Sequence, residues 1–224
     1  GRYILTGGAD GVVRLWPARD EQESLRFQCP EGIRSIAYSP DGKEILVGGY
    51  DHTAGLWSRQ TGQQLFALPV KDYNTWDVGF APDGAEFFTI NDDGRITFWS
   101  RETRQKIWAL GQRVHPNAFV EYKSVLYAPD GGEFLCVNWW GGMRICPCEA
   151  GRGCRALPFD YAEGLPFSGA FSPDGQSILA GFSDGTLRLM ARNTGAEIRR
   201  FTGPGQTIQS VAFSADGRTV AGGS

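Results

Sequence analysis

The chain has 224 residues, with 22 basic and 25 acidic side chains and a formal net charge of −3 at pH 7. A nucleic-acid partner calls for an excess of positive charge, and no basic run here is longer than a pair such as Arg199-Arg200, so we expect no such partner. No apolar run approaches the ~18 residues that a membrane-spanning helix needs, so we expect no membrane partner either.

A short phrase recurs along the chain: an aromatic residue, a small residue, usually a proline, and then Asp-Gly. Its copies lie at 38–42, 80–84, 127–131, 171–175 and 213–217. By subtraction of residue numbers, the aspartates follow one another at 42, 47, 44 and 42 residues. Proline fixes φ, aspartate caps the backbone and glycine takes a positive φ, so the phrase predicts a strand that ends in a tight hairpin turn. A period of this length is typical of a propeller blade.

Each period predicts four antiparallel strands. The first strand ends in the phrase and carries apolar or small residues on both faces, as expected of a strand buried between neighbouring blades. A second apolar run follows at 45–47, 87–89, 134–136 and 178–180. A turn carrying Asp10, Asp51, Asp93 or Asp184 leads to third strands at 12–16, 53–57, 95–99 and 186–190, and a polar turn leads to fourth strands such as 64–68 and 197–201. We expect these second-turn aspartates only to cap backbone amides.

The pattern Gly-Gly-x-Asp-x-x-x-x-Leu-Trp at 7–16 and 48–57, together with Phe-Ser-Pro-Asp-Gly, resembles the tryptophan–aspartate (WD) repeat family of β-propellers. The resemblance covers essentially the whole chain and implies an all-β propeller of four-stranded antiparallel blades. About five blades are present, whereas rings of this family most often have seven, so we expect an arc of a larger ring. We expect one repeat segment over 1–224, a fragment of a longer array, with units at 1–41, 42–83, 84–130, 131–174 and 175–216 and a partial unit at 217–224.

The chain departs from the family pattern in two ways. The residues that stand where the family usually has a histidine, twelve before the turn aspartate, are Cys29, Lys71, Ala118, Ala162 and Pro204. The family's hydrogen-bond network of His, Asp, Ser or Thr and Trp therefore cannot be complete in any blade, and we expect stability to depend more on packing. In the fourth unit, Trp140 replaces the second-turn aspartate and Cys146 replaces the tryptophan.

The resemblance implies that protein or peptide partners bind at the rim that carries the loops into the first strands. The residues seven positions before each turn aspartate are Arg34, Trp76, Lys123, Phe167 and Gln209. Aromatic and arginine side chains on a rigid scaffold are common interface anchors, so we expect this set to contact the partner. Packing between blades is the alternative, and it is strongest for Trp76 and Phe167.

The second turn lies on the same rim and adds Tyr50, His52, Trp139 and Trp140. Successive side chains diverge, so the two adjacent tryptophans cannot both point into one core, and we expect at least one to be exposed for binding. The alternative is that both fold over a displaced loop. The long connection at 111–121 carries His115, which we also expect at the binding face, although a solvated loop is an equal alternative.

The five cysteines are an odd number without the spacing of a disulfide framework, which predicts a reducing, cytoplasmic location. Cys146, Cys148 and Cys154 flank the turn at 149–153, and three readings stay open. Ordinary small side chains are favoured, a disulfide between Cys148 and Cys154 is conceivable, and a structural zinc lacks a fourth ligand. We therefore predict no metal and no cofactor.

Catalytic motifs are not found. The two histidines, His52 and His115, have no sequence context for a nucleophile, and there is no Gly-x-Ser-x-Gly or phosphate loop. We predict a non-catalytic scaffold that binds proteins or peptides. The alternative is a regulatory or ligand-gating propeller attached to a hydrolase- or kinase-type module of a longer chain, whose other domains are then possible partners.

Overall fold

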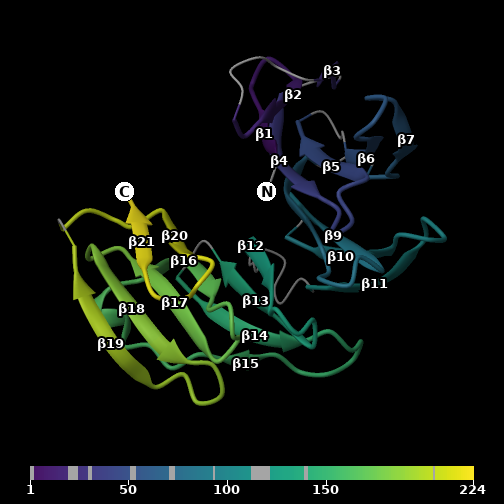
Figure 1. Ribbon diagram of the computed structural model, residues 1–224. Coiled ribbons are helices and arrows are strands. Elements are labelled where there is room, and N and C mark those ends of the chain that lie inside the picture. The colour runs from purple at the N-terminus through teal and green to yellow at the C-terminus, as the bar shows by residue number, and fades with distance from the viewer. Residues whose placement is uncertain are drawn as a thin grey trace. The chain divides into compact units, whose positions relative to one another are not determined.

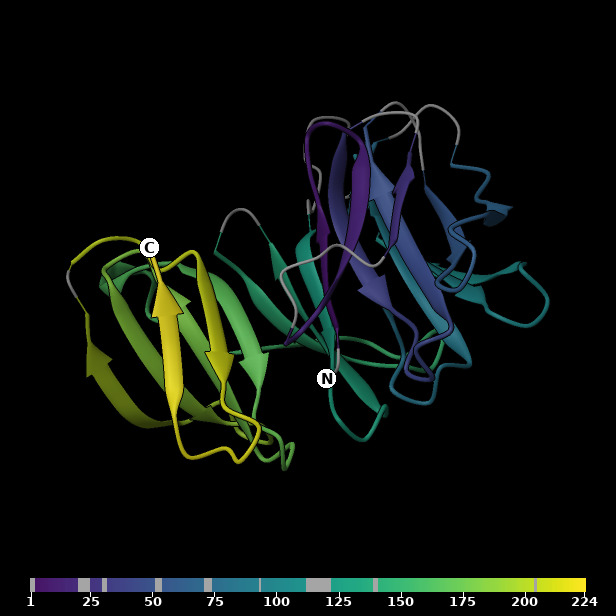
Figure 2. The same cartoon turned by 45° about the horizontal axis from the view of Figure 1, so that its top comes forward.

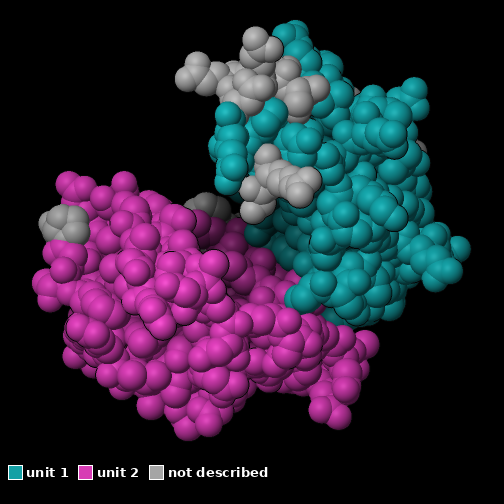
Figure 3. Space-filling view, viewed as in Figure 1, with its two compact units in different colours: residues 1–121 teal, residues 122–224 magenta. Residues whose placement is uncertain are grey.

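The structure is a computed structural model that describes residues 3–19, 25–29, 32–50, 54–70, 74–92, 94–111, 122–138, 141–203 and 205–224. Within these residues the regular structure is β-strand throughout, apart from one 3-10 turn, η1 (Tyr161–Glu163). The described part of the chain contains no helix long and apolar enough to cross a membrane. Contacts divide the chain into two compact units, residues 1–121 and residues 122–224, which are coloured separately in Figure 3 and are described one at a time.

Unit 1 holds three antiparallel sheets whose strands lie side by side in chain order (Figure 1). The first sheet contains β1 (Tyr3–Gly7), β2 (Val12–Pro17) and β3 (Leu25–Gln28). The second contains β4 (Ile33–Tyr38), β5 (Glu44–Gly49), β6 (Ala54–Ser58) and β7 (Gln64–Ala67). The third contains β8 (Thr75–Phe80), β9 (Glu86–Asn91), β10 (Ile96–Ser100) and β11 (Lys106–Leu110).

Unit 2 continues the pattern with two four-stranded sheets and a final pair of strands. The fourth sheet contains β12 (Tyr122–Tyr127), β13 (Glu133–Asn138), β14 (Met143–Pro147) and β15 (Arg155–Ala156). The fifth contains β16 (Pro166–Phe171), β17 (Ser177–Phe182), β18 (Thr186–Ala191) and β19 (Glu197–Thr202). The last pair is β20 (Ser210–Phe213) and β21 (Val220–Gly223).

Every sheet is an up-and-down meander, as Figure 2 shows, and this is the strand order of a propeller blade. The predicted fold class of four-stranded antiparallel blades is confirmed. Sheets and sequence units are offset from each other. The unit at 42–83, for example, supplies β5, β6 and β7 of one sheet and β8 of the next.

The turn between first and second strands has the predicted chemistry. Asp41 Oδ1 accepts hydrogen bonds from Ser39 Oγ at 2.6 Å and from the Lys43 amide at 3.1 Å. Gly42 has a φ of 66°, a left-handed conformation that glycine adopts without strain. The same bonds recur around Asp174 and Asp216, so the turn is a repeated structural part.

The second strands carry the core, and the first strands, which the sequence predicts to be buried between blades, are less buried than the second strands. All six residues of β5 are buried, whereas β4 is mostly half-buried. The physical reason is position, because a second strand is hydrogen-bonded along both edges and a first strand along only one. Small residues in the first strands do serve close packing: a Cβ on Gly169 of β16 would lie 2.5 Å from Met143 and 2.7 Å from Leu135 of the preceding sheet.

Apolar clusters fill the spaces between neighbouring sheets of each unit. One cluster in unit 1 joins Val13 of β2 to Ile45 and Trp57 of the second sheet, and it includes Cys29. Cys29 stands at the family's histidine position, and burial raises the pKa of its thiol to about 11. Packing has replaced a hydrogen bond at this point, as predicted.

Part of the family's hydrogen-bond network nevertheless survives in two sheets. The indole Nε1 of Trp16 donates to Thr6 Oγ1 at 3.0 Å, and that of Trp99 donates to Thr89 Oγ1 at 3.2 Å. In the fourth sheet, the strand register puts Cys146 at the tryptophan position and Cys136 at the threonine position, and their sulfurs are 3.9 Å apart.

Cys146 forms a disulfide with Cys154, across a sequence separation of 8 residues. The favoured prediction of ordinary small side chains is wrong for these two cysteines, and the conceivable Cys148–Cys154 pairing is also wrong, since Cys154 is bonded to Cys146. Proximity explains the pairing: Cys146 lies in β14, next to the short strand β15 that begins at Arg155, and its Cα is 4.2 Å from that of Cys154. Among the described residues no group of three or more possible ligands is placed to hold a metal ion.

An arginine joins adjacent sheets at the turn-bearing rim of each unit. Arg192, just after β18, donates from Nη1 to Asp130 Oδ2 at 2.7 Å and from Nε to Glu133 Oε2 at 2.9 Å. In unit 1, Arg101 makes the equivalent pairs with Asp41 at 2.9 Å and with Glu44 at 2.5 Å. We call this arrangement the arginine clamp.

The disulfide generates the first prediction. Replacing Cys154 by Ser should lower the free energy of unfolding of unit 2 by about 2.5 kcal/mol, because it frees a short loop in the unfolded chain. Urea unfolding with and without reductant measures this difference. Cys148→Ser is the matched control, and it should keep the tryptic cross-link between residues 145–152 and 153–155, whereas Cys146→Ser should lose it. A cross-link that is lost in Cys148→Ser and kept in Cys146→Ser would contradict the assignment of the disulfide to Cys146 and Cys154.

The arginine clamp generates the second prediction. Hydrogen bonds from Arg192 and from the Gly132 amide hold the pKa of Asp130 below its usual value. Burial acts in the opposite direction but is the weaker effect. A lowered pKa stabilises the fold at neutral pH, above the unfolded value of about 4, and this contribution is lost as pH falls through the folded value. Arg192→Gln should therefore lower the unfolding free energy by about 1 kcal/mol at neutral pH, since water screens the pair with the exposed Asp130, and by less near pH 3.

Urea unfolding at both pH values, with exposed Arg218→Gln as the charge-matched control, tests the clamp. An equal loss in the two variants, or a loss in Arg192→Gln that does not shrink in acid, would rule the clamp out as a source of stability.

Candidate functional site

β-Bulges mark one end of the first strand in four sheets. The pairing of β4 with β5 passes from Ile33↔Gly49 to Ser35↔Gly48, so Arg34 has no opposite residue. The same shift in the other sheets leaves out Trp76, Lys123 and Phe167. A bulge turns an extra side chain out of the regular alternation and is common beside binding sites. Four of the five residues predicted from their distance to the turn aspartate therefore share one backbone irregularity, and we call the ends that carry them the bulge rim.

In unit 1, the bulge rim brings Arg34 and Trp76 from adjacent sheets into contact. The guanidinium carbon of Arg34 lies 3.3 Å from the centroid of the Trp76 ring and 5.1 Å from that of Tyr50. Arg34 Nη1 also donates to Tyr50 Oη at 3.0 Å. Tyr50 follows β5 and is 45% exposed, so the second turn does meet the first strand at this rim.

Asp92, in the second turn of the third sheet, fixes the tryptophan. Its Oδ1 accepts a hydrogen bond from Trp76 Nε1, and its Oδ2 accepts from the amide of Asn74 at 3.2 Å and from Asn74 Nδ2 at 2.7 Å. The ring of Trp76 is thereby held in one orientation with its face against Arg34. The result is a half-buried aromatic platform that carries an exposed cation.

In unit 2, the equivalent residues converge from three consecutive sheets. Lys123 Nζ donates to the Phe167 carbonyl at 3.0 Å and lies 3.5 Å from Gln209 Oε1 and 5.2 Å from the Phe167 ring. Burial lowers the pKa of Lys123. These side chains link neighbouring sheets, as the packing alternative predicts, and they also lie at the rim. Contact with a partner stays a prediction.

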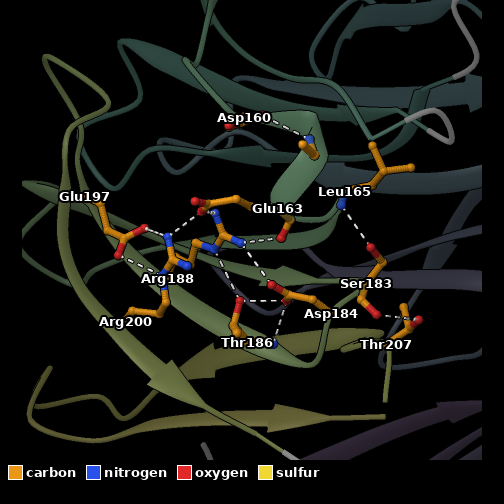
Figure 4. Close-up of polar contacts among 11 residues, drawn as sticks. Asp160, Glu163, Leu165, Ser183, Asp184, Thr186, Arg188, Glu197, Arg200 and Thr207 are labelled. Carbon is orange, nitrogen blue, oxygen red and sulfur yellow. Dashed lines mark hydrogen bonds and ion pairs between the residues drawn. The ribbon is translucent and has the colours of Figure 1, made fainter. Parts of the chain in front are cut away.

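A charged network anchors the loop that leads into β16, as Figure 4 shows. The buried Arg188 donates from Nη2 to the Glu163 carbonyl at 2.6 Å and pairs with Asp184 at 3.0 Å. Arg200 pairs with Glu163 at 2.7 Å and with Glu197 at 2.9 Å, so the loop is held from two strands.

Two of the four second-turn aspartates, Asp51 and Asp93, lie outside the described residues. The other two, Asp10 and Asp184, do more than cap backbone amides, which corrects the prediction for them. Asp184 accepts from the Thr186 amide at 2.9 Å and also pairs with Arg188, four residues later. Burial alone would raise the pKa of Asp184, but hydrogen bonds from Thr186 and Arg188 hold it below its usual value. Asp10 shows the same double use, capping the Val12 amide at 3.1 Å and pairing with Arg14 at 2.6 Å.

Ser183 joins two loops to the second turn of the fifth sheet. Its amide donates to the Leu165 carbonyl at 2.8 Å, its Oγ accepts from the Leu165 amide at 2.9 Å, and its carbonyl accepts from Thr207 Oγ1 at 3.3 Å (Figure 4). The residues that enter β16 and those that precede β20 are thus fixed to one turn. Phe167 and Gln209 stand on backbone that these bonds hold in place.

Four of the predicted site residues lie outside the described residues. They are His52, His115, Trp139 and Trp140. Sequence reasoning missed Arg188, Glu163 and Asp92, although one signal was present for the first: an arginine follows the second-turn aspartate by four residues at both Arg14 and Arg188. Glu163 and Asp92 occupy loop positions that do not repeat, so the period could not point to them.

The profile of the WD domain, G-beta repeat family matches residues 1–17, 22–58, 167–189 and 195–224. The guanine nucleotide-exchange factor SEC12 of Rattus norvegicus is 40% identical over 57 residues, which are 25% of this chain and 13% of that protein. The serine-threonine kinase receptor-associated protein of Gallus gallus is 23% identical over 224 residues, 99% of this chain and 49% of that protein. A guanine nucleotide-binding protein subunit beta of Nicotiana plumbaginifolia is 35% identical over 66 residues, 29% of this chain and 18% of that protein.

The chain thus spans about half, or less, of the length of these relatives. Family matches lie near both ends of the chain, and the blade-like sheets continue through the part between them. By these matches and by its blade-like sheets, the chain is similar to the WD-repeat family.

Proposed function

We propose that the chain is a non-catalytic interaction module that binds a protein or peptide partner at the bulge rim. The observation that carries the proposal is the set of four bulges, each of which presents a different large side chain at the same end of its sheet. Two relatives bear names that denote association with other proteins: the kinase receptor-associated protein and the subunit beta of a guanine nucleotide-binding protein.

The mechanism is pre-organisation of the rim. Asp92 holds Trp76, and the network of Arg188 and Glu163 holds the loop before Phe167. Side chains and loops that are ordered before binding lose little entropy when the partner arrives, so a few anchors give useful affinity. Aromatic and arginine residues are the types that most often act as such anchors.

Further residues join the proposed surface on their sequence position alone. His52, Trp139 and Trp140 stand in or beside second turns, and His115 stands in the long connection, all at the ends of strands that lead to this rim. We also propose a partner outside the nucleic-acid and membrane classes, and a cytoplasmic location. A cytoplasmic location implies that the Cys146–Cys154 disulfide is exposed to reductants there.

A second candidate is a propeller that regulates an enzymatic module of a longer protein. The similarity to SEC12 favours this candidate, because SEC12 is named as an exchange factor. The matching part is only 13% of SEC12, so most of that protein lies outside the match. A partner domain within the same longer chain would then occupy the bulge rim.

The test of the proposal is selection of a random peptide library on the immobilised chain. Selected peptides should bind a Trp76→Ala/Phe167→Ala variant at least about tenfold more weakly, because the bulge rim of each unit then lacks an anchor. The matched control is Leu65→Ala/Ile198→Ala, which removes two apolar side chains that are 51% and 57% exposed on fourth strands. Circular dichroism and urea unfolding establish that each variant is folded.

Hydrogen exchange with a bound peptide gives a second readout, with protection expected at 32–35, 74–77 and 165–168. A library that yields no binders, or binders that are weakened by the control and not by the rim variant, would overturn the proposal. A separate Trp139→Ala/Trp140→Ala variant should also lose affinity, and unchanged binding would remove these two residues from the surface.

A further inference from the structure

Arg34 differs in its electrostatic pairing from Arg101, Arg188 and Arg192, the arginines that link sheets or anchor a loop. Arg101, Arg188 and Arg192 each pair with two carboxylates. Arg34 is exposed and makes no ion pair within the described residues, and its one hydrogen bond is to the neutral hydroxyl of Tyr50. A guanidinium has five N–H donors in a planar fork, so the described residues of unit 1 use only a small part of its donor capacity.

The surroundings of Arg34 hold this unpaired charge in one place. Its guanidinium is stacked on Trp76, whose indole is in turn bonded to Asp92. Both Asp92 oxygens accept hydrogen bonds from Trp76 and Asn74, and Asp92 forms no ion pair with Arg34. Asp77, the next carboxylate along β8, is bonded instead to Ser35 Oγ at 2.8 Å. Of the described residues, the two acids Asp92 and Asp77 are therefore bonded to the residues that carry or adjoin the platform.

We propose that Arg34 recognises an anionic side chain of the peptide partner, either a carboxylate or a phosphate ester. This proposal rests on the proposed function of the bulge rim and names the chemistry of one contact there. Arginine presents two parallel N–H donors that match the oxygens of either group, and such charge-assisted pairs are stronger and more directional than neutral ones. Stacking on Trp76 fixes the fork beforehand, so less entropy is lost on binding.

A cationic partner group does not fit this site. The aromatic face of Trp76 that would attract a partner's lysine or arginine is already covered by Arg34, whose charge would repel it. A nucleic acid is disfavoured by the net charge of −3. Lys123 of unit 2 is not a second site of this kind, because its ammonium is directed to the Phe167 carbonyl.

The experiment extends the random peptide selection with three variants of the chain. Arg34→Gln removes the charge, Arg34→Lys keeps the charge without the planar fork, and Arg26→Gln removes an exposed positive charge from β3 of the same unit as a matched control. Peptides selected on the unmodified chain should be enriched in Asp and Glu. Affinity should fall roughly tenfold to a hundredfold in Arg34→Gln and by an intermediate factor in Arg34→Lys, and it should not change in Arg26→Gln.

The same selected peptide, remade with Gln or phosphoserine in place of its acidic residue, separates the two sources of negative charge. Gln should weaken binding to the unmodified chain and make it insensitive to Arg34→Gln, whereas tighter binding of phosphoserine would assign the site to phosphate. A labelled thymidine oligonucleotide tests whether the site binds a nucleic acid instead. Binding of this oligonucleotide that is lost in Arg34→Gln would overturn the assignment to peptides.

The outcomes distinguish this inference from the function on which it rests. A selection without binders overturns both. Binders that depend on Trp76 and Phe167, yet show no acidic preference or keep that preference in Arg34→Gln, preserve the interaction module and overturn only the role of Arg34.

Discussion

The structure depends on the aspartate carboxylate in the turn after each first strand. This carboxylate closes the hairpin, and in two of the turns it also pairs with an arginine of the adjacent sheet. In the turn after each first strand, an aspartate oxygen accepts the local amide and, where serine precedes, a hydroxyl, which closes the hairpin. In Asp41 and Asp130 the same carboxylate also receives the arginine of the next sheet. Register within a sheet and attachment between sheets are thus set by one group. Residues at any fixed distance from that aspartate are consequently brought to equivalent places, and this makes the repeat a reliable guide to position.

The fourth sheet shows how the fold tolerates loss of a repeated part. Its tryptophan and threonine positions hold Cys146 and Cys136, and its fourth strand, β15, has only two residues. The indole-to-hydroxyl bond seen for Trp99 and Thr89 is absent there, and a covalent bond from Cys146 to Cys154 ties the short outer strand to its neighbour instead. A cross-link of this kind acts mainly on the unfolded chain, so it can replace native contacts without restoring them.

The period predicted the strands, the turns and the strand order because these depend on local chemistry that repeats. It also predicted which residues share the bulge rim, since Arg34, Trp76, Lys123 and Phe167 stand at one distance from the turn. It could not predict the bulges, which depend on how two strands pair, nor the loop anchored by Glu163, whose sequence is not part of the repeated phrase. The period also could not predict that β5 is more buried than β4. The two strands are alike in apolar content, and only their place in the sheet differs.

The two rims use the same residue type in opposite ways. At the turn-bearing rim, the side chains of Arg101 and Arg192 are 19% and 16% exposed, and each pairs with carboxylates of the adjacent sheet. These ion pairs neutralise the arginine charge and hold the sheets together. At the bulge rim of unit 1, the contact between adjacent sheets is made by the stack of Arg34 on Trp76, which attaches the sheets without neutralising the charge. A link of that kind contributes to packing while leaving a fixed cation at the surface. Structural and binding roles can therefore reside in one side chain, and this is the physical reason to look for the partner at the bulge rim rather than at the clamps.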